Sequence, residues 1–172
     1  QDGRIWMSEY SQGVWEDPWQ ITSSNGTYVC EGIVSQRRNA YTNGFAFDRQ
    51  TGRLHFSWIW REGDELTNTQ HDLMYAYSSD WGRTWFNTQG ACVGDNTARM
   101  SMDSPVTIWE IDGHRGMKNQ HSMSVDEKGR PHIVLYYLQD EEPDLPLGKK
   151  DENRSRYDHF YLDLGGTWHR RE

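Results

Sequence analysis

The chain has 172 residues, a length that predicts one domain or a piece of a larger one. Its 26 acidic and 18 basic residues give a formal net charge of −8, which argues against nucleic acid as a partner because phosphate contacts need clustered positive charge. The longest apolar run, Ile133–Leu138, is far shorter than the roughly 20 residues that span a bilayer, so no membrane partner is expected.

Aromatic residues make up 13% of the chain, a composition that favours strands burying a large area per residue. The first strand-like segments, Arg4–Tyr10 and Trp15–Ile21, are interpreted as the last two strands of a repeat unit whose beginning is missing, so residues 1–21 form the end of one unit. A complete unit is expected within residues 38–88. Its four strands are Gly44–Asp48, Leu54–Trp60, Asp72–Ser78 and Thr84–Asn87.

An octapeptide at residues 78–85 joins the last two strands of this unit. It fits the pattern Ser-x-Asp-x-Gly-x-Thr-Trp, known as the Asp box, with Ser78, Asp80, Gly82, Thr84 and Trp85 at the defined positions. The pattern predicts a tight turn in which Asp80 accepts backbone N–H groups, Gly82 has a positive φ, and Trp85 returns into the sheet as an apolar anchor.

A second complete unit is expected within residues 105–172, where Pro105–Ile111 is another extended stretch. The segment Val125–Ile133 resembles Phe47–Phe56, since each has an apolar strand end, an Asp, a Gly-Arg turn and a strand that carries His. A weaker copy of the octapeptide keeps Asp163, Gly165, Thr167 and Trp168 without the leading Ser. The four expected strands are Ser122–Asp126, Pro131–Leu138, Arg156–Asp163 and Thr167–Arg170.

Tandem four-stranded antiparallel units are typical of a β-propeller, in which each unit is one blade. The sequence holds about two and a half such blades, fewer than the roughly four to eight of a closed ring. We therefore expect an all-β, partial β-propeller that is a fragment of a longer ring. The alternative is a small β-sandwich, which also has short strands at regular spacing.

Strand order sorts the polar residues onto two ends of the blades. The Gly-Arg turns and both Asp-box turns share one end, and the starts of the inner strands and the long loop from Gln139 to Arg156 share the other. Arg side chains grip carboxylates or sulfates, and His and Tyr exchange protons when their surroundings shift their pKa values. The candidates at this second end are Arg38, Asn43, Arg61, His71, Asn119, His121, Tyr137, Arg156 and Tyr157.

The histidines of the chain, His71 among them, can also be interpreted as structural residues. His55 and His132 lie inside strands and are interpreted as packing or hydrogen-bonding groups, and a satisfied loop histidine is as plausible for His71 as a catalytic one. His159 and His169 show no metal-ligand spacing, and no zinc-type Cys/His cluster occurs, so neither a metal nor a cofactor is predicted. Cys30 and Cys92 leave their pairing and the compartment open.

The sequence resembles the BNR-repeat (Asp-box) family of neuraminidase-like proteins over most of residues 38–172. The family includes lyases of ulvan, a sulfated uronate polymer, which are built as seven-bladed propellers. The resemblance therefore implies a fragment of a seven-bladed ring, an acidic polysaccharide or other glycan as partner, and a secreted or periplasmic location. The matching segments are Arg38–Phe45, Gly52–Glu62, His71–Tyr77, Asn119–His121, Val125–His132 and Arg156–Phe160.

The resemblance to ulvan lyases also implies roles for individual residues. His71 and His121 would handle protons or face the carboxylate, and Tyr137 or Tyr157 would be a base or an acid. Arg38, Arg61 and Arg156 would contact anions, with Asn43 and Asn119 as further substrate contacts. An Arg expected near the end of the strand after His121 is replaced by Tyr136 or Tyr137. A sialidase-type glycoside hydrolase and a non-catalytic glycan-binding propeller are the alternatives.

Overall fold

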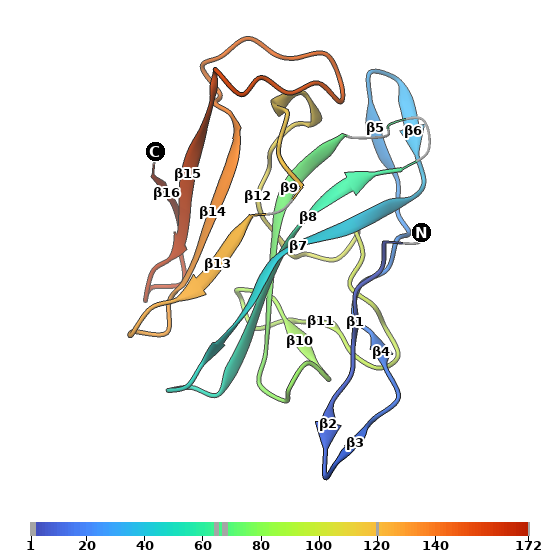
Figure 1. The fold of residues 1–172 in the computed structure, drawn as a ribbon, viewed down its shortest axis with the longest axis vertical. Coiled ribbons are helices and arrows are strands. Elements are labelled where there is room, and N and C mark those ends of the chain that lie inside the picture. The colour runs from blue at the N-terminus through green and yellow to red at the C-terminus, as the bar shows by residue number, and fades with distance from the viewer. Residues whose placement is uncertain (1–2, 64–65, 67–68, 120, 172) are drawn as a thin grey trace.

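The computed structural model describes residues 3–63, 66, 69–119 and 121–171, and these form mainly strands and loops, with the 3-10 turn η2 at Gly113–Arg115. Two sheets of long strands stand side by side, and shorter hairpins flank them at the N-terminal side (Figure 1). No helix in this part of the chain has the length and apolar character needed to cross a membrane.

The N-terminal segment forms two short antiparallel pairs. β1 (Trp6–Met7) pairs with β4 (Trp19–Gln20), and β2 (Tyr10–Ser11) pairs with β3 (Val14–Trp15) at the tip. The prediction that Arg4–Tyr10 and Trp15–Ile21 contain neighbouring strands is confirmed. A hairpin that the sequence did not reveal follows, formed by β5 (Tyr28–Cys30) and β6 (Ile33–Ser35).

The second sheet contains the predicted meander. Its strands run in the order β11 (Cys92–Gly94), β10 (Trp85–Phe86), β9 (Gln70–Ser78), β8 (Arg53–Glu62) and β7 (Arg38–Asp48). β12 (Thr107–Trp109) also belongs to this sheet, because it pairs with Leu73 and Met74 of β9. Short β10 pairs with β9 at Tyr77, and β12 pairs with β9 farther along the same edge, while the boundary between units at residue 105 stays a prediction.

The third sheet has the four predicted strands in the order β13 (Ser122–Val125), β14 (Pro131–Leu138), β15 (Ser155–Leu162) and β16 (Trp168–Arg171). Its inner strand β13 lies against β7, where Met123 approaches the backbone of Gly44. The all-β fold of tandem antiparallel meanders is thus confirmed, and the number of blades in a complete ring stays a prediction.

Side chains alternate across the sheets and so build two separate cores. Phe56, Trp58 and Trp60 of β8 face the N-terminal hairpins in one buried cluster. Ile59 of the same strand faces the third sheet in the other cluster, together with residues such as Phe160. The sheets therefore stack face to face, as blades do. Cys30 is buried, Cys92 is exposed, and both are free thiols.

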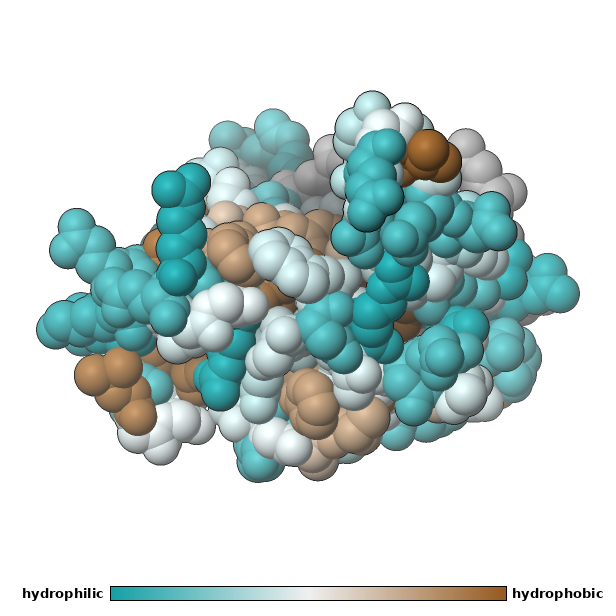
Figure 2. All heavy atoms as spheres, turned by 90° about the horizontal axis from the view of Figure 1, so that it is seen from below, coloured by the Kyte–Doolittle hydropathy of each residue, from teal (hydrophilic) through white to brown (hydrophobic). Residues whose placement is uncertain are grey.

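The predicted sorting of the loops onto two ends agrees with the arrangement of the strands. The β7–β8, β9–β10 and β13–β14 turns lie at the lower end in Figure 1, where the Gln50 side chain donates to the Glu127 carbonyl. The long β14–β15 loop and the β5–β6 hairpin lie at the upper end. Figure 2 views the lower end and shows a mostly hydrophilic or intermediate surface with scattered hydrophobic residues.

The turn at residues 78–85 has the predicted geometry. One carboxylate oxygen of Asp80 accepts the backbone N–H groups of Arg83 at 3.1 Å and Thr84 at 2.8 Å, and the Ser78 hydroxyl donates to it at 2.7 Å. Gly82 has φ 85°, and Trp85 is buried with its indole N–H on the Gly82 carbonyl.

The second copy of the turn needs one correction. Asp163 accepts the Thr167 N–H at 2.9 Å as expected, but the positive φ of 84° falls on Gly166 and not on Gly165. Trp168 is only half-buried and donates its indole N–H to Thr88 of the neighbouring sheet at 3.0 Å. The aligned glycine was therefore one residue early, because two glycines occur in succession and the second takes the left-handed position.

Candidate functional site

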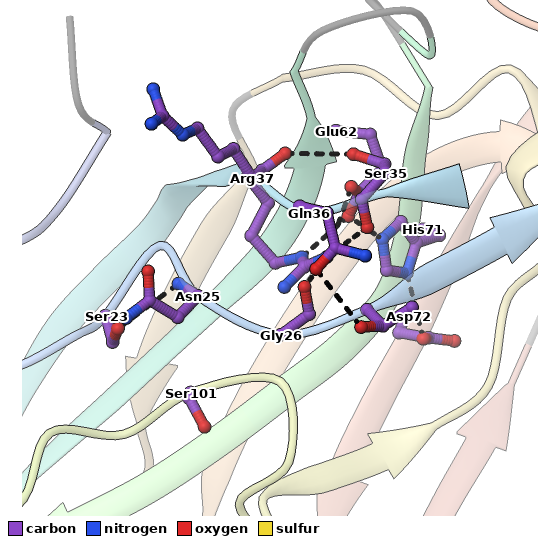
Figure 3. A network of polar contacts seen from close by, with 12 residues as sticks. Ser23, Asn25, Gly26, Ser35, Gln36, Arg37, Glu62, His71, Asp72 and Ser101 are labelled. Carbon is purple, nitrogen blue, oxygen red and sulfur yellow. Dashed lines mark hydrogen bonds and ion pairs between the residues drawn. The ribbon is translucent and has the colours of Figure 1, made fainter. Parts of the chain in front are cut away.

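Two of the predicted site residues, Arg38 and His71, lie in a buried network of charged groups. Arg38 Nε donates to Glu62 Oε1 at 2.8 Å, and its side chain has no exposed surface. His71 lies between Glu62 and Asp72, with Nε2 and Nδ1 each 2.9 Å from a carboxylate oxygen (Figure 3). The Tyr28 ring from the β5–β6 hairpin stacks over His71, with 3.9 Å between ring centroids.

The two carboxylates decide the protonation state of His71. Burial alone would lower the pKa of His71, but the hydrogen bonds to Asp72 and Glu62 raise it above its ordinary value. Because ionised carboxylates only accept, each ring nitrogen of His71 donates in this arrangement and neither has a free lone pair with which to accept a proton. The catalytic role of His71 and the anion contact of Arg38 stay predictions; in this structure both side chains are partners in a buried network that ties β7, β8 and β9 together.

Asn43 and Tyr137 are also buried, because strand alternation points both side chains toward a buried face of their sheets. Asn43 Nδ2 donates to Ser57 Oγ at 2.9 Å inside the second sheet. The Tyr137 hydroxyl donates to Asp158 at 2.6 Å in the core between the sheets, and burial together with Asp158 raises its pKa. The roles of Asn43 in substrate binding and of Tyr137 in catalysis stay predictions, and both side chains are enclosed in this structure.

His121 and Tyr157, by contrast, meet at a surface groove of about 500 Å³ on the third sheet. Tyr157 of β15 is 66% exposed, and its ring lies 4.8 Å from that of Tyr136 on the neighbouring strand β14. Register places Tyr136 directly opposite Tyr157, so both point to the same face while Tyr137 points to the core. The lining residues are Lys118, His121, Ser122, Val134, Tyr136, Glu152 and Tyr157.

One basic side chain, Lys118, lines this groove, and Lys150 lies close enough to feel the charges of Lys118 and Arg61; we refer to Arg61, Lys118 and Lys150 as the cationic cluster. Burial lowers the pKa of Lys150, and the nearby charges of Lys118 and Arg61 lower it further. The ammonium of Lys118 lies 5.8 Å from the centre of the Tyr136 ring. Arg61 donates to the Tyr41 hydroxyl at 2.5 Å. Segments far apart in the sequence thus concentrate positive charge at one place.

The environment of His121 keeps its imidazole neutral. Burial is the main cause that lowers its pKa to about 4, and the charge of Lys150 acts in the same direction. Nε2 lies 3.4 Å from the Tyr136 carbonyl oxygen. Because a carbonyl oxygen only accepts hydrogen bonds, this contact places the single ring proton of the neutral imidazole on Nε2. The Nδ1 atom therefore carries the lone pair; it is buried in this structure and has no hydrogen-bond partner among the described residues.

Asn119 and Arg156 lie outside the groove lining. Asn119 accepts a hydrogen bond from the Gln70 side chain and so connects the segment before β13 to the second sheet. Arg156 is opposite Tyr137 in the register, points away from the Tyr157 face, and pairs with Glu141 at 3.7 Å. Gln120 of the predicted Asn119–His121 motif is outside the described residues.

The two histidines interpreted as structural behave in that way. His55 is buried with Nδ1 2.6 Å from the Tyr75 hydroxyl, and His132 contacts His159 at 2.8 Å. Sequence reasoning missed Lys118 and Tyr136, which line the groove, and Lys150 of the cationic cluster. A signal for Tyr136 was present, because alternation along β14 allows only one of Tyr136 and Tyr137 to be exposed. No local pattern marked the two lysines.

Two solved structures with a similar fold are polysaccharide lyases. The lyase Uly1 matches with a TM-score of 0.70 and 16% identity, over 98% of this chain and 35% of that one. An ulvan lyase of family PL25, bound to -[GlcA(1-4)Rha3S]-, matches with a TM-score of 0.58 and 15% identity, over 92% of this chain and 35% of that one. The chain thus spans about a third of the length of these proteins, and at this identity the likeness shows the fold.

The search of curated proteins returned no match to this chain. The family comparison, however, covers the whole sequence. Residues 1–172 match the profile described as "BNR repeat-containing family member". This agrees with the repeated four-stranded meanders and with the Asp80 turn. The chain belongs to the BNR repeat-containing family.

Proposed function

We propose that this protein binds an acidic, uronate-containing polysaccharide at the groove and cleaves it by β-elimination. The observation that carries the proposal is the cationic cluster beside a neutral His121 and two tyrosines, in a chain whose net charge is −8. The lyases with a similar fold, one of them bound to a glucuronate-containing glycan, support the substrate class. A protein that acts on such a polymer would be secreted or periplasmic.

The proposed reaction has three requirements, and the groove has candidates for each. The cationic cluster neutralises the uronate carboxylate, which makes the C5 proton more acidic. His121, neutral above a pH of about 4, accepts that proton. The C4–O bond then breaks as the C4–C5 double bond forms, and a tyrosine hydroxyl of Tyr157 or Tyr136 protonates the leaving oxygen.

The test is to incubate the full-length protein with several uronate polymers and to follow the ultraviolet absorbance of the unsaturated product. We expect turnover that His121→Asn reduces by roughly 10²-fold or more, the range typical of a lost proton-transfer group. Arg61→Gln should weaken binding of the polymer. Arg156→Gln is the matched control, because Arg156 is exposed and faces away from the groove, and it should behave as the unsubstituted protein does.

Other results would replace this proposal. Release of reducing sugar without unsaturated product would indicate a glycoside hydrolase of sialidase type. Binding of the polymer without any turnover, weakened by Arg61→Gln, would indicate a glycan-binding propeller. Absence of both binding and turnover with every uronate polymer would rule out an acidic glycan as the ligand.

A further inference from the structure

The long loop between β14 and β15 delivers one carboxylate to the cationic cluster. Glu152 forms an ion pair with Lys118, and the Tyr136 hydroxyl donates to the backbone carbonyl of Glu152 at 2.8 Å. The pKa of Glu152 is lowered by its hydrogen bond to Lys118 and also by the charge of Lys150. A negatively charged group therefore already sits at the place where a substrate anion would bind.

The other acidic residues of this loop have partners elsewhere. Arg170 of β16 pairs with Asp140 at 2.6 Å, and Arg115 of η2 pairs with Asp144 at 3.0 Å. Arg154 pairs with both Glu142 and Asp151, and Arg156 pairs with Glu141. The pairs with Arg170, Arg115 and Arg156 connect the loop to the third sheet and η2, and the pairs with Arg154 lie within the loop. Among the described residues of the loop, Glu152 is the acidic side chain that lines the groove.

The ion pair between Glu152 and Lys118 is well suited to exchange. The side chain of Glu152 is 74% exposed and that of Lys118 is 33% exposed, so water competes for both charges. Exposed pairs of this kind contribute little to stability. An incoming carboxylate or sulfate can replace Glu152 at Lys118 with little loss of free energy, because the pair that it breaks is weak. A neutral sugar has no charged group that could take the place of Glu152.

We propose that Glu152 stands in for a substrate anion in the unliganded protein and is displaced from Lys118 when an acidic glycan binds. The inference rests on the proposed function, because it assigns Glu152 a role in substrate binding at the same groove. Glu152 then competes with the substrate anion for Lys118: an acidic glycan must displace it, whereas a neutral chain leaves it in place.

The test measures binding of a glucuronate polymer by calorimetry in parallel with the absorbance assay for turnover. Glu152→Gln should tighten binding by about two- to fivefold, the value of an exposed ion pair converted to a ratio of dissociation constants. Glu141→Gln removes the same charge from the same loop but from a pair with Arg156 outside the groove, so it should leave binding within error. In a Lys118→Gln background, Glu152→Gln should have a smaller effect, because its partner is gone.

The outcomes separate this inference from the function on which it rests. Tighter binding by Glu152→Gln without turnover in any variant would support the displacement and exclude the lyase reaction. Turnover by the unsubstituted protein with weaker or unchanged binding in Glu152→Gln would overturn the displacement and leave the lyase in place. Equal gains from Glu152→Gln and Glu141→Gln would overturn it too, since the effect would then be one of overall charge. Absence of binding in all variants would exclude both proposals.

Discussion

At the scale of single residues, burial separates charged groups that maintain the fold from groups that can meet a ligand. Arg38 and Arg61 are both basic residues of the second sheet, yet Arg38 is fully enclosed beside Glu62 while Arg61 belongs to the cationic cluster. An enclosed charge that loses its partner is costly, whereas an exposed pair contributes little. Substitutions of the two classes should therefore differ in what they change.

Removal of the central carboxylate of the buried network should destabilise the protein. Glu62→Gln removes the negative charge that Arg38 and His71 share and places an NH2 group where one carboxylate oxygen accepts from Arg38, and we expect a loss of about 3–5 kcal/mol of unfolding free energy. Glu141→Gln, at an exposed pair, should cost less than about 1 kcal/mol. Urea denaturation measures both, and equal losses would contradict the assignment of the network to stability.

His121 should set the acidic limit of activity. Its pKa is lowered to about 4 from the ordinary value of 6.5, so the base form is present above a pH of about 4 in the folded protein. The rate should stay high as the pH falls through 6 and decline near 4. Lys150→Met removes one cause of the lowered pKa and should move this limit upward. A rate profile measured for both proteins checks this, and a limit near 6.5 in the unsubstituted protein would exclude His121 as the base.

The same shift has a consequence for stability. A histidine whose pKa is lower in the folded state binds fewer protons there than in the unfolded state when the pH lies between the two pKa values. His121 therefore makes the folded state less stable as the pH falls from 6.5 to about 4, and it has no such effect above this window.

At the scale of elements, the two Asp-box turns show how sequence encodes a local structure and where neighbours add to it. In both turns an Asp accepts backbone N–H groups and a glycine adopts a positive φ. The environments differ, because a Cβ at Gly82 would lie 2.7 Å from the Met7 sulfur, whereas a Cβ at Gly166 would meet nothing within 4 Å. The first turn is thus packed against the N-terminal hairpin.

This difference predicts unequal effects of one substitution. Gly166→Ala should cost about 1–2 kcal/mol, the strain of a left-handed alanine. Gly82→Ala should cost more, since it adds a clash with Met7 and a contact of 3.2 Å with the Trp85 ring. Thermal unfolding of the two variants provides the comparison. Equal losses would mean that the first turn and the N-terminal hairpin do not depend on each other.

At the scale of the whole molecule, a chain of net charge −8 repels an acidic polymer, and the cationic cluster must supply the attraction locally. Binding should then weaken steeply as salt rises from about 0.1 M to about 1 M, where the screening length falls from about 10 Å to about 3 Å. Lys118→Gln should make this dependence shallower. Calorimetry across the salt series tests it, and salt-independent binding would exclude the cluster as the main contact.

The sequence by itself determined the features that depend on neighbouring residues along the chain. The meander strands, the Asp80 turn and the two ends of the blades all follow from alternation and turn chemistry over short stretches. Alternation along β14 also implied that only one of Tyr136 and Tyr137 is exposed, and the strand register was needed to show that it is Tyr136. Membership of the family agrees with these repeats.

Only the tertiary structure decided which polar residues are enclosed and which meet at a surface. Whether a strand residue faces core or solvent depends on what packs against the sheet, and this placed Arg38, His71 and Tyr137 inside. The cationic cluster joins Arg61 of β8 to Lys118 and Lys150 of two loops, because the stacking of sheets brings distant segments together. No local pattern carries that information, since the spacing of these residues in the sequence reflects only the lengths of the intervening strands and loops.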